Sequence, residues 1–585
     1  MKGIGVSPGI AIGRAQVLKK QEILVTGIGL RSEEEVQQEI KKFEDAVKAA
    51  VGEVEALKAT LPDDDPGLDI LEIQTELLQD EQIGVDVTKK ITIEKRCAND
   101  AVIEVIEIAR DVFQNMNDEY FSAREADVQD AGNRILRHLN GSLQGLAQSL
   151  WAGRTERSFS GGAQITGENT IIIAEDITPS DTLIMDTARV SGFATQTGSK
   201  TSHAAIIARA KGIPAVVGCG AGLEVIRTND LVIVDGLEGV ILVQPSQTMI
   251  DEYAARKMAF AKQVALLNDL KDVEARTTDG VKITLLANIS GVAEMEASFL
   301  SGGEGSGLLR TEMLFMGRNA LPGEEEQFEF YKSIAIKAKG RPVTVRSLDI
   351  GGDKQLPYLN LPAEPNPFLG YRAIRISLDQ KEIFITQLRA ILRASQFGQL
   401  KIMLPMISNV QEVRQARAIL EEVKTDLSSA GIAFDRGIPL GIMIEIPSAA
   451  VTADILAREV DFFSIGTNDL CQYTLAVDRM NERVKHLYDP FNPGVLRLIQ
   501  QVIVQGDKHH IHTGMCGELA GDVQATLLLL GMGLKEFSMS VSSIPYVKNI
   551  IIHNSMATAR EICQRVMAMD SSETILDYLQ EAMQS

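Results

Sequence analysis

The chain has 585 residues, 45% of them hydrophobic and 23% charged, which excludes a disordered chain and a single small domain and predicts two to four packed domains. No apolar run approaches the ~18 residues that span a bilayer, and five isolated cysteines predict a reducing compartment, which we expect to be the cytoplasm. The net charge of −21 without a Lys/Arg run argues against nucleic acid as a partner.

The first 150 residues combine short strands with acidic helices. Residues 11–18 and 22–26 have strand composition, and Ser32 followed by Glu35 forms a capping box before a long helical pattern. Three more helical stretches follow to about residue 150, and residues 31–140 carry −14 of the net charge of −21. This stretch would attract a basic partner protein, although an ordinary solvated helical face gives the same pattern and is the simpler interpretation of charge alone.

Strand composition returns after a turn-rich connector at residues 151–169. Five short strand patterns and one helical stretch at 202–212 lie between residues 170 and 245. They predict a small α/β domain formed by residues 1–30 and 156–246, with the helices of residues 31–155 inserted into it.

The remainder of the chain predicts a linker helix over residues 247–275 and a larger domain over residues 276–585. Eight short apolar segments alternate there with helical stretches, which favours a (β/α)8 barrel over an open doubly wound sheet, although spacing alone leaves both possible. The expected strands are residues 282–288, 305–310, 343–349, 401–407, 440–446, 461–467, 512–517 and 536–540.

Polar residues follow most of these expected strands, where the mouth of a barrel would lie. Loops begin at strand ends and are polar in any protein, which is enough to explain any single one of these residues. It is a weaker explanation for several arginines and acids directed at one cavity. The residues are Asn288, Arg310, Arg346, Asp349, Glu445, Asn468, Asp469 and Cys516.

The chemistry of this set points to a phosphorylated small anion. The planar guanidinium of arginine matches phosphate and carboxylate, and the oxygens of Glu445 and Asp469 suit Mg²⁺, which commonly uses one or two carboxylates plus substrate phosphate. A lone cysteine such as Cys516 is more often a buried apolar residue than a catalytic one. The arginines available for clamping the anion are Arg310, Arg346, Arg372 and Arg479.

A second candidate site lies in the smaller α/β domain. His203 follows a Gly/Ser/Thr turn and begins a helical stretch, where free N–H groups favour phosphate and a ring nitrogen could accept a phosphoryl group. A histidine with no special role fits that position at least as well. At His509, His510 and His512 we expect no metal, because no carboxylate lies nearby in the sequence at ligand spacing.

Taken together, the motifs resemble enzyme I of the bacterial phosphoenolpyruvate-dependent sugar phosphotransferase system over essentially the whole chain. The matching strings include SPGIAIG, TSHAAIIAR, GLLRTEMLFMGRNALPGEEEQF, LDIGGDK, NPFLGYRAIRI, DFFSIGTNDLCQYTLAVDR and MCGELAGD, in that order. The resemblance implies a swivelling phosphohistidine α/β domain, an inserted helical domain that docks a small histidine-containing phosphocarrier protein, and a dimerising barrel that binds phosphoenolpyruvate.

The resemblance also implies roles for single residues. His203 would be phosphorylated and oriented by Thr182, and Cys516 would protonate the enolate to give pyruvate. Glu445 and Asp469 would bind Mg²⁺. The phosphate would be held by Arg310, Arg346, Arg479 and Asn468, with Arg372 near the carboxylate and Asp469 also at the substrate.

Two alternatives are weighed against this function, which would be the first step of sugar uptake. A phosphoenolpyruvate synthase or pyruvate phosphate dikinase would need a nucleotide-binding domain, for which the sequence has no P-loop. A regulatory protein that docks partners without chemistry would not need the full set of arginines, acids and Cys516. We expect the sugar-uptake branch rather than nitrogen-type regulation.

Overall fold

The computed structural model describes residues 1–18, 29–59, 67–114, 119–139, 169–175, 177, 190–198, 202, 205, 208, 212–316, 318, 320–352, 356–359, 361, 364–481 and 483–584. These residues form two compact units, residues 1–263 and 264–585, which we describe one at a time. Within the described residues, no helix is both long and apolar enough to cross a bilayer.

Among its described residues, the helical module of the first unit has four helices after its long first one, where we expected three. The Ser32–Glu35 capping box is confirmed, with the Glu35 N–H donating to Ser32 Oγ at 3.2 Å. The additional helix begins because Asp80 caps it, accepting from the Ile83 N–H at 2.9 Å only two residues after the preceding helix ends, without a Gly or Pro between them. The helices are α1 (Glu33–Lys58), α2 (Gly67–Leu78), α3 (Glu81–Thr92), α4 (Ala98–Gln114) and α5 (Glu119–Leu139).

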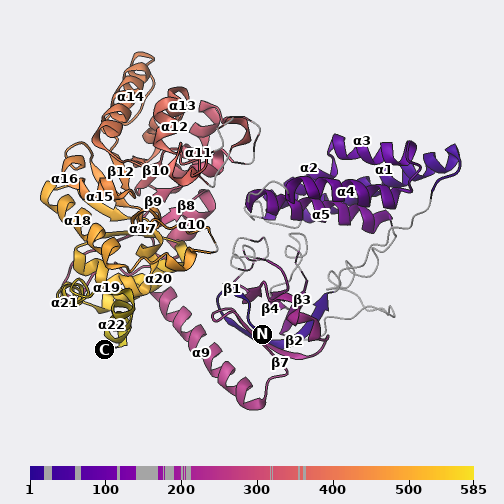
Figure 1. Ribbon diagram of the computed structural model, residues 1–585, viewed down its shortest axis with the longest axis horizontal. Coiled ribbons are helices and arrows are strands. Elements are labelled where there is room, and N and C mark those ends of the chain that lie inside the picture. Colours follow the sequence, from indigo (N-terminus) through magenta and orange to yellow (C-terminus); the bar gives the residue numbers. More distant parts are fainter. Residues whose placement is uncertain are drawn as a thin grey trace. The chain divides into compact units, whose positions relative to one another are not determined.

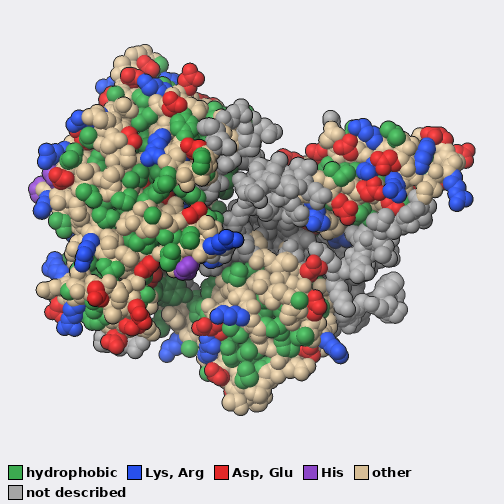
Figure 2. Space-filling model, in the orientation of Figure 1, with side chains coloured by type: hydrophobic (Ala, Val, Ile, Leu, Met, Phe, Trp, Pro, Cys, Tyr) green, Lys and Arg blue, Asp and Glu red, His purple; other side chains and the backbone are tan. Residues whose placement is uncertain are grey.

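The surface of this module mixes charges despite its acidic composition. On the face seen in Figure 2, red and blue side chains lie intermixed over the helices, and no broad patch of one sign stands out. Ion pairs between neighbouring turns, such as Lys58–Glu55 at 3.0 Å and Lys89–Asp86 at 3.2 Å, produce this mixture.

The α/β part of the first unit is a mixed sheet in the order β1-β5-β4-β3-β2-β6-β7. The strand β1 was not predicted; it is short and pairs antiparallel with β5. The expected strand at 22–26, most of the connector at 151–169 and most of the expected helix at 202–212 lie outside the described residues. The strands are β1 (Ile4–Ser7), β2 (Ile10–Leu18), β3 (Thr170–Ala174), β4 (Val190–Thr195), β5 (Ala215–Val217), β6 (Leu231–Asp235) and β7 (Val240–Val243).

One exposed helix, α9 (Gln247–Asp269), begins where the linker helix was expected. The boundary between the two compact units falls within it, after residue 263. Just beyond its end, the buried Lys548 donates to the carbonyls of Leu270 and Lys271 at 3.2 and 3.0 Å, which fastens the end of the linker to the second unit.

The second unit is a closed barrel of eight parallel strands, ordered β8 to β15 around the ring. Each expected strand is confirmed, and closure excludes the open doubly wound sheet. The strands are β8 (Thr284–Ile289), β9 (Ser306–Leu309), β10 (Val343–Arg346), β11 (Leu400–Leu404), β12 (Leu440–Ile444), β13 (Phe462–Ile465), β14 (His512–Met515) and β15 (Glu536–Met539).

Helices surround this barrel, drawn in Figure 1 in colours from magenta through orange to yellow. Their apolar faces and the outward-facing strand residues form one continuous core. The helices are α10 (Val292–Leu300), α11 (Glu324–Lys337), α12 (Ile374–Asp379), α13 (Lys381–Ala394), α14 (Val410–Ser429), α15 (Pro447–Val451), α16 (Ala453–Leu456), α17 (Thr467–Leu475), α18 (Pro493–His509), α19 (Val523–Met532), α20 (Ile544–His553), α21 (Met556–Val566) and α22 (Ser572–Gln584).

Candidate active site

Most of the expected site residues lie at the carboxyl ends of the barrel strands. Arg310 follows β9, Arg346 ends β10, Glu445 follows β12 and Cys516 follows β14. Because all eight strands are parallel, these ends meet at one mouth. The structure therefore brings together residues that are more than 200 positions apart in the chain.

Arg346 is held between two carboxylates in the wall of this mouth. Its side chain is almost fully buried, its Nη2 donates to Glu312 Oε1 at 2.6 Å, and its Nη1 lies 3.0 Å from Asp349 Oδ2. Glu312 was not among the predicted residues, although it stands two positions after Arg310. The sequence alone does not indicate a role for this carboxylate, because its partner Arg346 is brought next to it only by the fold.

The same arrangement continues to the next arginine. Arg372 Nη2 donates to Asp349 Oδ1 at 3.0 Å and to Asp469 Oδ2 at 3.3 Å, and its Nη1 donates to the hydroxyl of Tyr473 at 3.1 Å. On the other side of Asp469, Arg479 Nη2 lies 3.8 Å from Oδ1. Asp349 and Asp469 thus each lie between two arginines, and the buried charges alternate in sign along the mouth.

Donors remain available in this alternating series. Among the described residues, the buried Nε atoms of Arg346, Arg372 and Arg479 have no hydrogen-bond partner. A buried N–H without a partner is costly, and an anion with several oxygens would satisfy such donors. The arrangement is therefore suited to binding phosphate or carboxylate.

Glu445 is a buried carboxyl group whose pKa is strongly raised. It is 2% exposed and accepts from the Met406 N–H at 2.5 Å. Burial, together with the carboxylates of Asp469 and Asp349, raises its pKa to about 8. A divalent cation between Glu445 and Asp469 would relieve this repulsion, so the donor set fits Mg²⁺. No group of three or more His, Cys, Asp or Glu side chains is arranged as a metal site in the described part of the chain.

The thiol of Cys516 lies in the same mouth, packed among apolar side chains of the barrel interior. Burial raises its pKa to about 11, against smaller lowering effects of a hydrogen bond with Ser464 and of the Arg346 and Arg310 charges. Its backbone carbonyl accepts from Asn288 Nδ2 at 2.9 Å. The thiol therefore holds its proton at neutral pH more firmly than the ordinary value of about 8.5 would imply.

Asn468 is tied to the loop after β14. Its Nδ2 donates to Glu518 Oε1 at 3.0 Å, and its Oδ1 accepts from the Glu518 N–H at 2.9 Å. Glu518 was not predicted, and its only sequence signal is its place in the string MCGELAGD. This pair joins the segment that carries Asp469 to the segment that carries Cys516.

Two expected site residues, His203 and Thr182, lie outside the described residues. The histidine cluster near Cys516 is described, and it lies at the other end of the barrel. His512 begins β14, and its Nε2 is 2.9 Å from Glu536 Oε2 at the start of β15. The sequence did not predict Glu536 as a partner of His512, because Glu536 belongs to the neighbouring strand.

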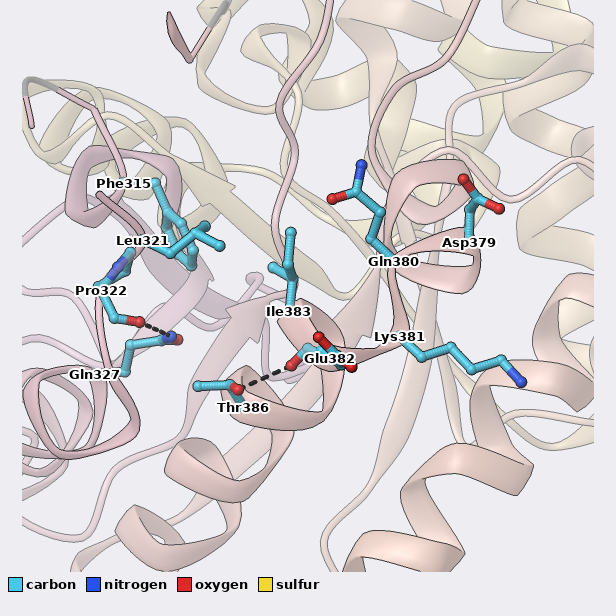
Figure 3. A pocket seen from close by; sticks show the side chains of 10 residues that line it. All are labelled: Phe315, Leu321, Pro322, Gln327, Asp379, Gln380, Lys381, Glu382, Ile383 and Thr386. Atoms are coloured by element: carbon cyan, nitrogen blue, oxygen red, sulfur yellow. Dashed lines mark hydrogen bonds between the residues drawn. The ribbon is translucent and has the colours of Figure 1, made fainter. Parts of the chain in front are cut away.

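A cavity of about 540 Å³ lies apart from the mouth, between the segment after Glu312 and the start of α13. Figure 3 shows two hydrogen bonds between residues that line this cavity. Gln327 Nε2 donates to the Pro322 carbonyl, and Thr386 Oγ1 donates to the Glu382 carbonyl. None of the expected site residues lines it. The barrel mouth therefore remains the candidate active site.

Comparisons with known proteins match the whole chain. Family models match residues 264–556 (PEP-utilising enzyme, PEP-binding domain), 166–239 (PEP-utilising enzyme, mobile domain) and 2–124 (PEP-utilising enzyme, N-terminal). The chain is 44% identical to a phosphoenolpyruvate-protein phosphotransferase of Priestia megaterium, over 99% of this chain and 98% of that relative. It is 42% identical to the protein of that name from Buchnera aphidicola subsp. Acyrthosiphon pisum, over 99% of each, and 43% identical to that of Staphylococcus carnosus, over 99% and 98%.

Proposed function

The chain belongs to the phosphoenolpyruvate-protein phosphotransferase family, and from that premise we propose that it transfers the phosphoryl group of phosphoenolpyruvate to its own His203. The phosphoryl group then passes to a histidine of a small phosphocarrier protein, as the first step of sugar uptake. The observation that carries this proposal is the buried series of alternating arginines and carboxylates at the barrel mouth, with a protonated thiol beside it.

The arginines bind the substrate and stabilise the charge that moves. Arg310, Arg346 and Arg479, with Asn468, hold the phosphate, and Arg372 holds the carboxylate end. Fixed donors in a buried site stabilise phosphoryl transfer because they need no reorganisation as the charge develops. The carboxylates between the arginines support this role, since they hold each guanidinium in one orientation before substrate arrives.

Cys516 completes the reaction at carbon. The bond between phosphorus and the enol oxygen breaks as a bond forms between phosphorus and a ring nitrogen of His203, and the electron pair of the broken bond leaves an enolate. The methylene carbon of the enolate takes the proton of the Cys516 thiol, which gives pyruvate. The pKa of about 11 supports this role, because it keeps the proton on sulfur until the enolate forms.

Glu445 and Asp469 would hold Mg²⁺, which when bound neutralises negative charge on the substrate phosphate. The raised pKa of Glu445 supports a cation at this place, because the two carboxylates otherwise repel each other. Asp469 is also 3.3 Å from Arg372, so a residue that would hold the metal also orients a substrate arginine.

The remaining parts of the proposal concern partners. Thr182 orients His203, the helical module of residues 31–155 docks the phosphocarrier protein, the linker of residues 247–275 joins the parts, and the barrel of residues 276–585 forms a homodimer. We place the protein in the cytoplasm, with no nucleic acid as a partner. The similarity of residues 2–124 to the N-terminal model of PEP-utilising enzymes supports the assignment of the helical module.

The test is incubation with phosphoenolpyruvate labelled in its phosphate, with Mg²⁺, comparing the wild type with His203→Ala. We expect acid-labile, alkali-stable label on the wild type alone, with pyruvate released, and loss of label when a chelator removes the metal. His138→Ala is the matched control, because this histidine lies in the helical module, with its Nε2 3.1 Å from Glu53 Oε2; the variant should be labelled like the wild type.

Other outcomes distinguish the alternatives. Absence of label on folded, magnesium-supplied wild type would overturn the enzymatic function and favour a regulatory binding protein. Turnover that requires a nucleotide would favour a dikinase or synthase.

A further inference from the structure

Segment 310–312 joins two of the proposed substrate arginines. Arg310 is exposed directly after β9, whereas the next two residues, Thr311 and Glu312, are buried. The buried pair faces the end of β10, where Arg346 lies. One short segment therefore carries one of these arginines and contacts the other.

Thr311 and Glu312 hold Arg346 at two different points. Thr311 Oγ1 donates to the Arg346 carbonyl at 2.9 Å, which fixes the backbone. Glu312 Oε1 accepts from Arg346 Nη2 at 2.6 Å, which fixes the guanidinium. Thr311 and Glu312 thus fix the two ends of Arg346, its backbone and its guanidinium.

A buried amide completes this arrangement. Gln387 Nε2 donates to Thr311 Oγ1 at 3.2 Å and to the Tyr331 hydroxyl at 3.1 Å, and its Oε1 accepts from the Leu348 N–H at 2.9 Å. Gln387 is fully buried. The chain from the Arg346 carbonyl to the Leu348 N–H is therefore anchored by the buried side chains of Thr311 and Gln387.

We propose that Glu312 is a positioning residue for the reaction: it orients the Arg346 guanidinium so that its remaining N–H groups, Nε–H included, face the substrate phosphate. This proposal rests on the proposed function of Arg346. The carboxylate is required because a charge-assisted hydrogen bond in a buried site holds one orientation more firmly than a neutral one.

A purely structural role explains this pair less well. Buried ion pairs contribute little net stability, because desolvation offsets their attraction. Glu312 is 3% exposed, and Arg346 also has Asp349 at 3.0 Å as a partner for its charge. Glu312 binds Nη2 and Asp349 binds Nη1, so the two carboxylates together restrict rotation of the guanidinium.

The experiment measures single-turnover pyruvate release as a function of phosphoenolpyruvate concentration, with Mg²⁺. We expect Glu312→Ala to lower the maximal rate roughly 10- to 100-fold, the range for residues that orient a functional group, with the half-saturating concentration changed less. Glu312→Gln should recover only part of the loss, because its amide oxygen still accepts from Nη2 but the charge-assisted part of the bond is gone.

The control is Glu324→Gln, which removes a carboxylate paired with Arg389 and Arg393 outside the mouth and should leave the rate within about twofold.

Double variants separate orientation from a general loss of structure. In an Arg346→Lys background there is no guanidinium to orient, so adding Glu312→Ala should cost less than about twofold. Losses that multiply in the double variant, or Glu312 variants that behave like Glu324→Gln, would overturn the proposal. If Glu312→Ala does not fold, Glu312→Gln decides: a lowered rate at unchanged melting temperature supports it, and an unchanged rate overturns it. A wild type that releases no pyruvate would instead overturn the proposed function.

Discussion

Glu445 and Glu536 are two largely buried glutamates of one barrel, at opposite ends of it. Glu445 follows the carboxyl end of β12, and Glu536 begins β15. Burial and two neighbouring carboxylates raise the pKa of Glu445 to about 8. At Glu536 burial acts in the same direction, but the hydrogen bond and charge of His512 outweigh it, and the pKa is lowered.

The difference shows what each end is suited for. At the other end, the Glu536 carboxylate has a hydrogen bond with His512 and the charge of Lys401 nearby, which lower its pKa, so this carboxylate needs no ligand. At the mouth, Glu445 has the carboxylates of Asp469 and Asp349 as neighbours, and the Nε atoms of three arginines have no partner among the described residues. We therefore propose that a cation and an anion bind there. Such perturbed groups are typical of functional sites, and the following predictions test whether the two ends differ in this way.

The largest expected effect is at the mouth. Arg346→Lys keeps the charge but loses the planar fork that two carboxylates hold, so single-turnover pyruvate release should fall on the order of 100-fold. Arg389→Lys, at a surface pair with Glu324, serves as the control and should keep the wild-type rate. A fall of less than threefold for Arg346→Lys would contradict the role of the mouth.

Glu445→Gln should separate stability from activity. It removes a proposed metal ligand, so the magnesium-dependent rate should fall roughly 10- to 100-fold. The metal-free chain should nevertheless become more stable at pH 7, by on the order of 1 kcal/mol, because folding no longer requires a carboxyl group to take up a proton. Urea unfolding with a chelator measures this, and a less stable variant would show that the carboxylates do not repel each other.

Glu536→Gln should give the opposite pattern. The amide oxygen still accepts from His512, but the charge-assisted part of the bond is lost, so unfolding free energy should fall by about 1 kcal/mol. The half-exposed His512 keeps the loss small. Pyruvate release should stay within about twofold of wild type, and a larger loss would mean that the two ends are coupled.

The smallest effect is the pH dependence of these differences. Folded Glu445 keeps a proton that the unfolded chain has released, so its contribution to stability falls as pH rises from about 4.5 towards 8. The stability gain of Glu445→Gln should therefore grow over that range. Glu536 has a lowered pKa, so its contribution is present above its unfolded value of about 4.5 and is lost as pH falls through the folded one. Unfolding at pH 4, 6 and 8 measures both; trends of the same sign would contradict the comparison.

The barrel could be predicted from sequence because its strands are short apolar segments between helical patterns. The same pattern placed Arg346, Glu445 and Cys516 at strand ends. The strand β1 was missed because four residues, Ile4–Ser7, pair with β5 more than 200 positions later, and local composition carries no trace of such a partner. The break before α3 was missed because Asp80 caps that helix without a Gly or Pro.

Pairings between side chains were the part of the site that the sequence did not reveal. Glu312, Glu518 and Glu536 are ordinary acids in a chain rich in them, and only the barrel brings them to Arg346, Asn468 and His512. The raised pKa of Cys516 likewise depends on burial, which a motif does not report.

The most direct measurement counts products in one turnover without carrier protein. The wild type is mixed with excess labelled phosphoenolpyruvate and Mg²⁺, and both acid-labile label on the chain and released pyruvate are quantified. Phosphoryl transfer to His203 with proton transfer from Cys516 predicts equal amounts, about one of each per active chain. Pyruvate released in excess of bound label, with free phosphate accumulating, would contradict the account by making the protein a hydrolase.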